Sequence, residues 1–225
     1  ENEPYNYTLK CDTLNAISFG APQRRERFIM VGLKKGLNIE YTYPEAIFTE
    51  GSYRTVRDAI SDIQDIEPGK EVTDSYFTLP PHPEAQGLEK ELRGRCLHNH
   101  ITTATRETAL SRFKALKAGE NFHDLSPELK TTYSNAERTQ NTIYMRLKYD
   151  EPSGTVVNVR KSMWIHPELD RAISIREAAR LQTFPDSFIF EGTKDSQYQQ
   201  VGNAVPPFLA KAVAESIISI LDQTQ

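Results

Sequence analysis

Cysteine, tryptophan and long apolar runs are scarce in this sequence. Of its 225 residues, two are cysteines (Cys11 and Cys96) and one is a tryptophan. Two cysteines are too few for a disulfide framework, and neither has a metal-binding spacing, so we expect core thiols in a reducing cytoplasm. No apolar run approaches the roughly 20 residues that a membrane-spanning helix needs. The sequence therefore favours neither a disulfide scaffold nor a membrane protein.

The residues that are present suffice for a sizeable core. Hydrophobic residues make up 38% of the chain and charged residues 26%, and there are ten phenylalanines and ten tyrosines. This composition is typical of a globular chain with one large domain or two small ones, and it argues against disorder. The net charge of −4 is too small to argue for a membrane surface or against a polyanionic partner.

Charge is distributed unevenly along the chain. Residues 37–92 hold 12 acidic and 4 basic residues, whereas residues 93–164 hold 12 basic and 7 acidic ones. A basic segment inside an acidic chain is typical of a surface that faces a polyanion. Solvated faces of helices and turns would give the same count, so charge alone leaves both interpretations open.

Residue periodicity predicts three strands and two early helices. The expected strands are 5–10, 28–32 (buried) and 142–147. Helical spacing over 55–63 follows Thr55 as a plausible N-cap, and a further short helix is expected around 109–117.

The last third of the sequence predicts two more helices. Ser174 and Glu177 form a capping-box pattern that opens a helix running to about Thr183. A final helix is expected after Pro206–Pro207. Its apolar stripe consists of Leu209, Val213, Ile217 and Leu221.

Three dense clusters stand out, and the first is Leu14–Phe28. If the chain is extended from Gln23 onward, Arg25 and Arg27 project to one face and Glu26 to the other. Two adjacent guanidinium groups could bind a phosphate or a base edge in a bidentate manner. Structural ion pairs are an equally good explanation from the residues alone.

The other two clusters lie near the end of the chain. One is Arg171–Phe188, with Arg176-Glu177-x-Ala-Arg180-Leu-Gln-x-Phe-Pro-Asp at its centre, and the other is Gln199–Pro207. The Gly202-Asn203-Ala204 sequence before a helix start suits close approach of the backbone to a small ligand.

Taken in order, these clusters resemble the DNA cytosine-5 methyltransferases. The first is similar to their motif VIII (Pro-Gln-x-Arg-x-Arg), the second to motif IX, and the third to motif X (Gly-Asn-Ala-Val-Pro-Pro). The segment Asp150–Val156 also resembles the one that precedes motif IX in this family. The resemblance extends from about Tyr5 to Ile220 and points to the bacterial restriction–modification type.

The resemblance implies a reaction and a role for particular residues. A thiolate would add to C6 of a cytosine flipped out of double-stranded DNA, and C5 would take a methyl group from S-adenosyl-L-methionine. Arg27 would contact the cytosine or its phosphate, flanked by Arg25 and Gln23. The expected cofactor-binding residues are Asn203, Ala204 and Val205. The expected DNA-binding residues in the basic stretch 93–164 are Arg106, Arg112, Arg138 and Arg160. Arg176, Glu177 and Arg180 would mainly organise packing.

The resemblance also implies an architecture of the α/β class. We expect part of a Rossmann-like methyltransferase domain, with a parallel-rich sheet, and a smaller, irregular, β-rich target recognition domain. The expected boundaries are 1–37 for the catalytic part, 38–195 for target recognition including motif IX, and 196–225 for a C-terminal helix that returns to the catalytic domain. No metal site is expected.

Three motifs of the family are missing, and this shapes the remaining expectations. The sequence has no Pro-Cys dipeptide, no Gly-rich cofactor loop and no internal Glu-Asn-Val. We therefore expect the C-terminal half of an enzyme, starting after the helix that precedes motif VIII. Its partner would be an N-terminal half carrying the nucleophile, in the same full-length chain or as a separate subunit, and this piece alone would be inactive. The expected location is the bacterial cytoplasm, at the nucleoid. A transfer RNA methyltransferase of the same fold and a non-enzymatic DNA-binding module remain as alternatives.

Overall fold

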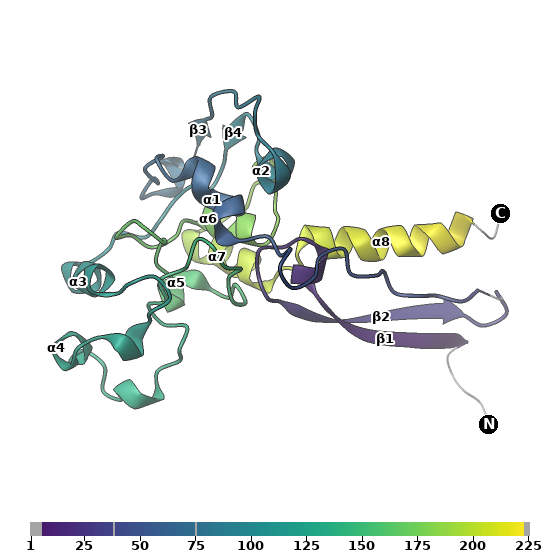
Figure 1. Ribbon diagram of the computed structural model, residues 1–225, viewed down its shortest axis with the longest axis horizontal. Coiled ribbons are helices and arrows are strands. Elements are labelled where there is room, and N and C mark those ends of the chain that lie inside the picture. Colours follow the sequence, from purple (N-terminus) through teal and green to yellow (C-terminus); the bar gives the residue numbers. More distant parts are fainter. Residues whose placement is uncertain (1–5, 38, 75, 223–225) are drawn as a thin grey trace.

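The computed structural model describes residues 6–37, 39–74 and 76–222. It places a long hairpin beside the last helix at one end of the molecule, and short helices joined by loops at the other (Figure 1). The strands are β1 (Tyr7–Asn15), β2 (Glu26–Lys34), β3 (Phe77–Thr78) and β4 (Cys96–Leu97). The helices are α1 (Val56–Ile60), α2 (Gly87–Leu92), α3 (Glu107–Ala115), α4 (Pro127–Lys130), α5 (Val159–Ser162), α6 (Ile175–Leu181), α7 (Lys194–Asn203) and α8 (Pro207–Asp222). Short 3-10 helices cover 16–19, 61–63, 72–74, 122–124 and 136–138.

The hairpin pairs β1 with β2 in antiparallel register, from Tyr7 opposite Lys34 to Asn15 opposite Glu26. Because side chains alternate along a strand, its two faces differ. One face leaves four large apolar side chains exposed: Tyr7, Leu9, Phe28 and Met30. The prediction of a strand at 28–32 is confirmed, but the prediction that it is buried is wrong. The predicted strand 5–10 corresponds to β1, which extends to Asn15, and Tyr5 lies outside the described residues.

The other face of the hairpin packs against α8 and the segment that follows β2. Leu14, Phe19 and Leu209 belong to one buried cluster at the base of the hairpin. Tyr41 is buried as well, and its hydroxyl lies 2.9 Å from Ser216 Oγ on α8. The final helix is thus confirmed, although only its first turns are well covered, because Leu209 is fully buried whereas Leu221 is 49% exposed.

The central core joins α1, α2, α6 and α7 around Trp164 and Tyr198. Two of the predicted helix starts, those at Thr55 and Ser174, are confirmed in detail. The backbone N–H of Thr55 donates to Asp58 (2.7 Å), and Ser174 Oγ accepts from the N–H of Glu177 (3.0 Å). These caps satisfy N–H groups that have no partner inside a helix.

The lobe at the far end contains α3 and α4 and has its own apolar cluster, which includes Phe113, Phe122 and Tyr144. Helix α3 confirms the prediction around 109–117. The predicted strand 142–147 is wrong, because this segment makes turns and only one bridge, between Arg146 and Ile165. Tyr144 has a φ of +53°, a left-handed conformation that interrupts an extended chain.

The region expected to be β-rich is mainly helix and loop. Within residues 39–74 and 76–195, the described strands are β3 and β4, each of two residues. Both sheets in the described part of the chain are antiparallel pairs, and the parallel-rich sheet that the resemblance implies stays a prediction. The expected boundary between residues 195 and 196 falls within α7, and the division into domains stays a prediction.

Among the described residues, no single helix has the length and apolar character to cross a membrane. Helices α7 and α8 taken together have the length and composition of a membrane-spanning segment, but the pair is bent by 44° at its break.

Candidate functional site

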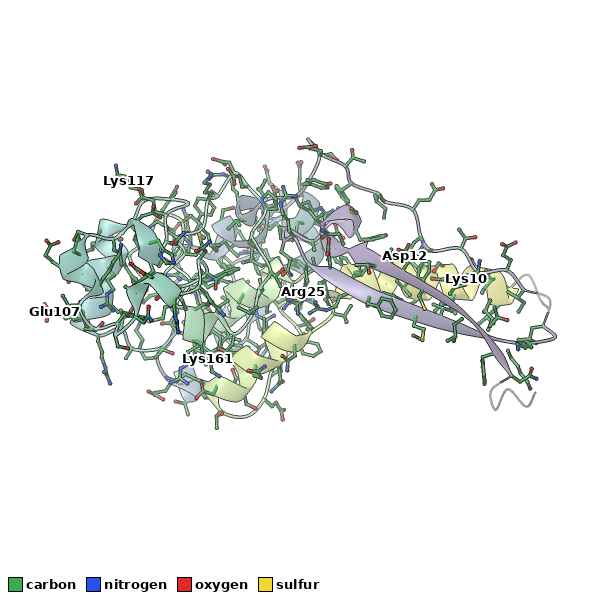
Figure 2. The ribbon with its side chains drawn as sticks, turned by 90° about the horizontal axis from the view of Figure 1, so that it is seen from below. Lys10, Asp12, Arg25, Glu107, Lys117 and Lys161 are labelled. Carbon is green, nitrogen blue, oxygen red and sulfur yellow. The ribbon has the colours of Figure 1, made fainter. Side chains whose placement is uncertain are left out.

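Arg25 joins three distant segments at the base of the hairpin. Its guanidinium donates to the carbonyl oxygens of Val156 (2.6 Å), Gly202 (2.6 Å) and Ala204 (3.2 Å), and the residue is 2% exposed. Figure 2 shows Arg25 where the hairpin meets the rest of the molecule. Because this side chain is buried among carbonyl groups, it positions the three segments, and its expected role beside Arg27 at the target nucleotide stays a prediction.

Gln23 is fully buried and has a similar role. Its amide nitrogen donates to the carbonyl of Leu181 (3.1 Å), and its amide oxygen accepts from the N–H of Val156 (3.0 Å). It thereby ties the motif VIII segment to the end of α6 and to the segment before α5. No part of the Gln23 side chain reaches the surface, and its expected place beside Arg27 at the target nucleotide stays a prediction.

Arg27 differs from its neighbours because its side chain is partly exposed. Its Nη2 donates to Ala204 O (3.2 Å), the carbonyl that also accepts from Arg25, and its Nη1 donates to Glu26 O (2.9 Å). The two arginines therefore share one face, as the sequence predicts. Partial burial lowers the pKa of Arg27, but an arginine stays charged in proteins. The result is a cation held by carbonyl groups, with no carboxylate partner among the described residues.

The expected cofactor-binding residues lie at the junction of α7 and α8, beside Arg27. Asn203 ends α7 with an exposed side chain whose Oδ1 accepts from Gln199 (2.7 Å). Val205 is 41% exposed, and the carbonyl of Ala204 is the one bound by both arginines. The structure thus brings Arg27 and residues 203–205 together, although 177 positions separate Arg27 from Ala204.

Gly202 allows a close backbone contact with the segment before α5. A Cβ at this position would lie 2.9 Å from the carbonyl carbon of Val157 and 3.1 Å from the nitrogen of Asn158. Those atoms are backbone and cannot move aside as a flexible side chain can. The glycine is therefore required where α7 crosses the chain before α5, and the expected ligand contact at residues 202–204 stays a prediction.

The motif IX residues lie in the core, in agreement with their expected packing role. Arg176, Glu177 and Arg180 have no solvent exposure. Arg176 donates to the carbonyls of His98 (2.7 Å) and Pro185 (2.8 Å). Burial alone would raise the pKa of Glu177, but the ion pair with Arg171, at 2.7 and 2.8 Å, lowers it to about 2.

The four arginines expected to bind DNA have different environments. Arg106 and Arg138 are exposed, and no described residue pairs with either guanidinium. Arg160 is partly exposed and forms an ion pair with Asp195. Arg112 is 6% exposed and donates to Leu129 O (2.7 Å) and to Tyr144 Oη (2.9 Å). Its assignment as a surface contact is corrected, because α3 turns this side chain into the lobe.

Sequence reasoning missed one positioning residue and misjudged the cysteines. Asn15 Oδ1 accepts from the N–H of Arg25 (3.0 Å) and of Ile17 (3.3 Å), so it fixes the turn that precedes motif VIII. An asparagine at the end of a strand pattern was the available signal. Cys11 is exposed rather than in the core, and Cys96 is partly exposed with its Sγ 3.0 Å from the Tyr76 hydroxyl.

Comparison with known proteins agrees with this arrangement. The family described as C-5 cytosine-specific DNA methylase matches residues 2–219. The type II methyltransferase M.DdeI of Desulfomicrobium norvegicum is 36% identical over 223 residues, covering 91% of this chain and 52% of that protein. The type II methyltransferase M1.HphI of Haemophilus parahaemolyticus is 35% identical over 218 residues, covering 97% and 50%.

A solved structure shows the same fold. The crystal structure of an Escherichia coli prophage protein assigned as a DNA modification methyltransferase superposes with a TM-score of 0.75 at 24% identity. The match covers 96% of this chain and 62% of that one. This likeness supports the mixed α/β class.

These findings correct one expectation. The prediction of a C-terminal half is wrong, because the family match covers essentially the whole chain and relatives align over 91% to 98% of it. The chain spans about half the length of the curated relatives it matches, 52% and 50% for the two above. Members of this family take their methyl group from S-adenosylmethionine. The chain belongs to the C-5 cytosine-specific DNA methylase family.

Proposed function

We propose that this chain acts in the methylation of cytosine at C5 in a specific sequence of double-stranded DNA, as part of a bacterial restriction–modification system. S-adenosylmethionine is the proposed methyl donor. Family membership and the type II methyltransferases among its relatives support this proposal. The residues proposed to act are Arg27 toward the target nucleotide and residues 203–205 toward the cofactor.

The observation that carries the proposal is the bond between Arg27 and the Ala204 carbonyl, at 3.2 Å. Methyl transfer requires the cytosine ring and the donor to meet in a fixed geometry, and such positioning accounts for much of the rate of a two-substrate reaction. A residue proposed for the cytosine and a segment proposed for the cofactor are here joined directly. Arg25 holds the same carbonyl from the buried side and so fixes both.

Arg27 suits the proposed contact with an extruded nucleotide. Flipping a base out of the duplex costs a few kcal/mol in lost stacking and pairing, so the protein has to hold the nucleotide in its new position. A guanidinium without a carboxylate partner can donate to a phosphate or to a cytosine oxygen through charge-assisted bonds. The two carbonyl contacts orient the group without neutralising it.

The residues at 203–205 fit one edge of the proposed cofactor. Val205 supplies an exposed apolar surface, and the Asn203 amide nitrogen has no hydrogen-bond partner among the described residues. S-adenosylmethionine has both apolar and hydrogen-bonding parts, and when bound it would supply the methyl group. These three residues would bind and orient it.

The cysteine nucleophile of the proposed reaction is not provided by Cys11 or Cys96. Cys11 lies on β1 of the exposed hairpin, and Cys96 contacts Tyr76 rather than a base. Activation of a thiol requires a neighbouring base, cation or helix N-terminus. We therefore expect residues 1–225 alone to transfer no methyl groups, and incorporation of labelled methyl into DNA by the purified chain would contradict this.

The proposal is tested by Arg27→Ala in the methylating enzyme that contains this chain. The assay uses labelled S-adenosylmethionine and duplex DNA. We expect 5-methylcytosine to form more slowly, by a factor that corresponds to a loss of about 2–4 kcal/mol of transition-state stabilisation, as for other positioned electrostatic groups. The melting temperature should change little. Arg24→Ala is the matched control, because Arg24 is exposed and, among the described residues, its side chain interacts with the Tyr53 ring alone.

Two outcomes would contradict the proposal. An unchanged rate with a lower melting temperature would make Arg27 a structural residue. Methylation of transfer RNA in preference to duplex DNA would replace the proposed substrate, so both nucleic acids are assayed under the same salt conditions.

A further inference from the structure

The end of helix α6 contacts the chain on both sides of residues 203–205. The Gln182 amide nitrogen donates to the carbonyl of Val201, in the last turn of α7. Thr183 Oγ1 accepts from the N–H of Phe208 (3.2 Å), in the first turn of α8. Both side chains of this pair are fully buried. The segment proposed to bind the cofactor is thus held from both ends by two successive residues.

The same end of α6 also contacts the segment that carries Arg27. The carbonyl of Leu181 accepts from the amide nitrogen of Gln23 (3.1 Å), which lies four residues before Arg27. A short stretch of backbone, residues 181–183, therefore connects the nucleotide side of the proposed site to its cofactor side.

Thr183 has a left-handed backbone, which is unusual for its residue type. Its φ is +66°. The N–H of Thr183 donates to Arg180 O (2.8 Å) and the N–H of Phe184 donates to Ala179 O (3.0 Å), a pair of bonds that ends a helix in a Schellman motif. Glycine is the usual residue directly after the C-cap of this motif, and a β-branched residue there is strained. Such strain persists where the surrounding structure requires it, and it is concentrated at functional sites.

The group that threonine has and glycine lacks is the hydroxyl that caps α8. The first N–H groups of a helix have no partner within the helix. Helix α8 begins at Pro207 and follows Pro206, and a proline side chain cannot accept a hydrogen bond. Thr183 Oγ1 takes the place of an N-cap side chain, although 25 positions separate Thr183 from Phe208. The placement of the start of α8 therefore depends on this hydroxyl.

We propose that Thr183 is a positioning residue for methyl transfer, and that Gln182 acts with it. Neither side chain has any solvent exposure, so both act through residues 203–205 and not on a substrate. Together they hold these residues where the Ala204 carbonyl meets Arg27. The inference rests on the proposed function, because the role of residues 203–205 toward the cofactor is part of it.

The first measurement is amide hydrogen exchange at Phe208 in the full chain, which needs no cofactor. Thr183→Val keeps the shape of the side chain and removes the acceptor. We expect the Phe208 amide to exchange about two- to tenfold faster, the range that loss of one hydrogen bond gives. Thr183→Ser keeps the hydroxyl and should exchange as the parent chain does. Thr131→Val is the matched control, because the Thr131 hydroxyl donates to Glu128 O (3.3 Å) at the exposed end of α4.

The second measurement is steady-state methylation by the enzyme that contains this chain. Thr183→Val and Gln182→Met should each raise the KM for S-adenosylmethionine by about two- to tenfold and leave the KM for duplex DNA unchanged. Gln182 Oε1 has no hydrogen-bond partner among the described residues, so Gln182→Met removes only the bond to Val201. Thr183→Ser and Thr131→Val should keep the parent's KM for the cofactor. A merely structural role would raise both KM values, because general loosening affects both substrates.

Three outcomes would overturn the inference: unchanged exchange at Phe208 in Thr183→Val, equal rises of the two KM values, or a parent-like KM for the cofactor in both Thr183→Val and Gln182→Met. If Thr183→Val fails to fold, Thr183→Gly replaces it, because glycine lacks the same acceptor and suits the left-handed backbone. Any of these results with an active parent enzyme leaves the proposed function standing. A parent enzyme that forms no 5-methylcytosine refutes the proposed function, and this inference with it.

Discussion

Arg180 and Asp186 form a two-point ion pair in which neither side chain has any solvent exposure. Arg180 Nε lies 2.8 Å from one carboxylate oxygen and Nη2 lies 2.6 Å from the other. Arg180 also binds Asp62, and Asp186 accepts from the N–H of Gly94 (3.2 Å). The pair therefore holds α6 to the 3-10 helix 61–63 that follows α1 and to the chain before β4.

The first prediction concerns this pair. Asp186→Asn leaves the buried Arg180 with one carboxylate in place of two, and breaking such a pair typically costs about 3–5 kcal/mol. We expect a loss of that order in the free energy of unfolding, measured by urea denaturation. Asp150→Asn is the control, because Asp150 pairs with Arg57 at the surface with 82% side-chain exposure and should cost less than about 1 kcal/mol. Equal losses in the two variants would contradict the assigned importance of burial.

The second prediction is a loss of stability in acid that originates at His166. Burial lowers the pKa of this histidine to about 4, from 6.5. Its Nδ1 accepts from the N–H groups of Glu168 (3.3 Å) and Leu169 (3.1 Å), and a proton there would face two donors. The unfolded chain takes up this proton below pH 6.5, whereas the folded chain does so only near pH 4. Stability is therefore complete above pH 6.5 and falls by on the order of 3 kcal/mol toward pH 4.

His166→Asn keeps an acceptor for the two N–H groups and removes the titration. We expect its free energy of unfolding to change less between pH 7 and pH 4 than that of the parent chain. His123→Asn is the control, since His123 is exposed. Two other groups act in the same direction: burial lowers the pKa of His100, and Glu177 loses its contribution as pH falls below about 4.5. A parent-like pH profile for His166→Asn would refute the assignment.

The third prediction uses the crossing at Gly202. Gly202→Ala would bring a methyl group to 2.9 Å from the backbone of Val157, so one of the two segments has to shift. Overpacking of this kind costs about 1–3 kcal/mol, which thermal denaturation would measure. Gly154→Ala should be neutral, because its added Cβ meets no atom within 4 Å. The Gly202 variant should also weaken cofactor binding, since the shift moves the Ala204 carbonyl away from Arg25 and Arg27.

The fourth prediction separates DNA attraction from cofactor binding. Replacing Arg106, Arg138 and Arg160 by alanine in one variant should lower the affinity for duplex DNA. The slope of log affinity against log salt concentration should become shallower by up to about 0.9 for each phosphate that is no longer neutralised. Affinity for S-adenosylmethionine should stay near normal. Lys211→Ala is the control, because Lys211 is an exposed residue of α8. Duplex binding that survives the triple change would make the basic stretch a solvated surface.

Local signals in the sequence predicted local structure well. The capping box at Ser174 and the helix start at Thr55 depend on residues three positions apart, and both form as expected. The shared face of Arg25 and Arg27 follows from strand geometry in the same way. Motif order also placed the chain in its family, because the motifs are short and contiguous.

Properties that depend on tertiary contacts could not be read from the sequence. Arg112 and Arg106 have the same charge and lie in the same basic stretch, yet one is buried in the lobe and the other is exposed. The alternation at 142–147 resembles a strand, but Tyr144 has a left-handed backbone and its ring lies in one buried cluster with Phe113 and Phe122. The alternating apolar residues of β2 did not indicate which face of the hairpin would be covered by the rest of the molecule.

The contacts of Arg25 have a consequence for the order in which the molecule assembles. Its acceptors lie 131, 177 and 179 positions further along the chain, whereas β1 and β2 are joined by a short connection and can pair at once. Contacts of such sequence separation form late, because the entropy of closing a long loop has to be overcome first. During synthesis, Arg25 and Arg27 of the hairpin would stay solvated until α7 and α8 have emerged from the ribosome. The junction of Arg27 with residues 203–205 is then completed only as the last helix docks.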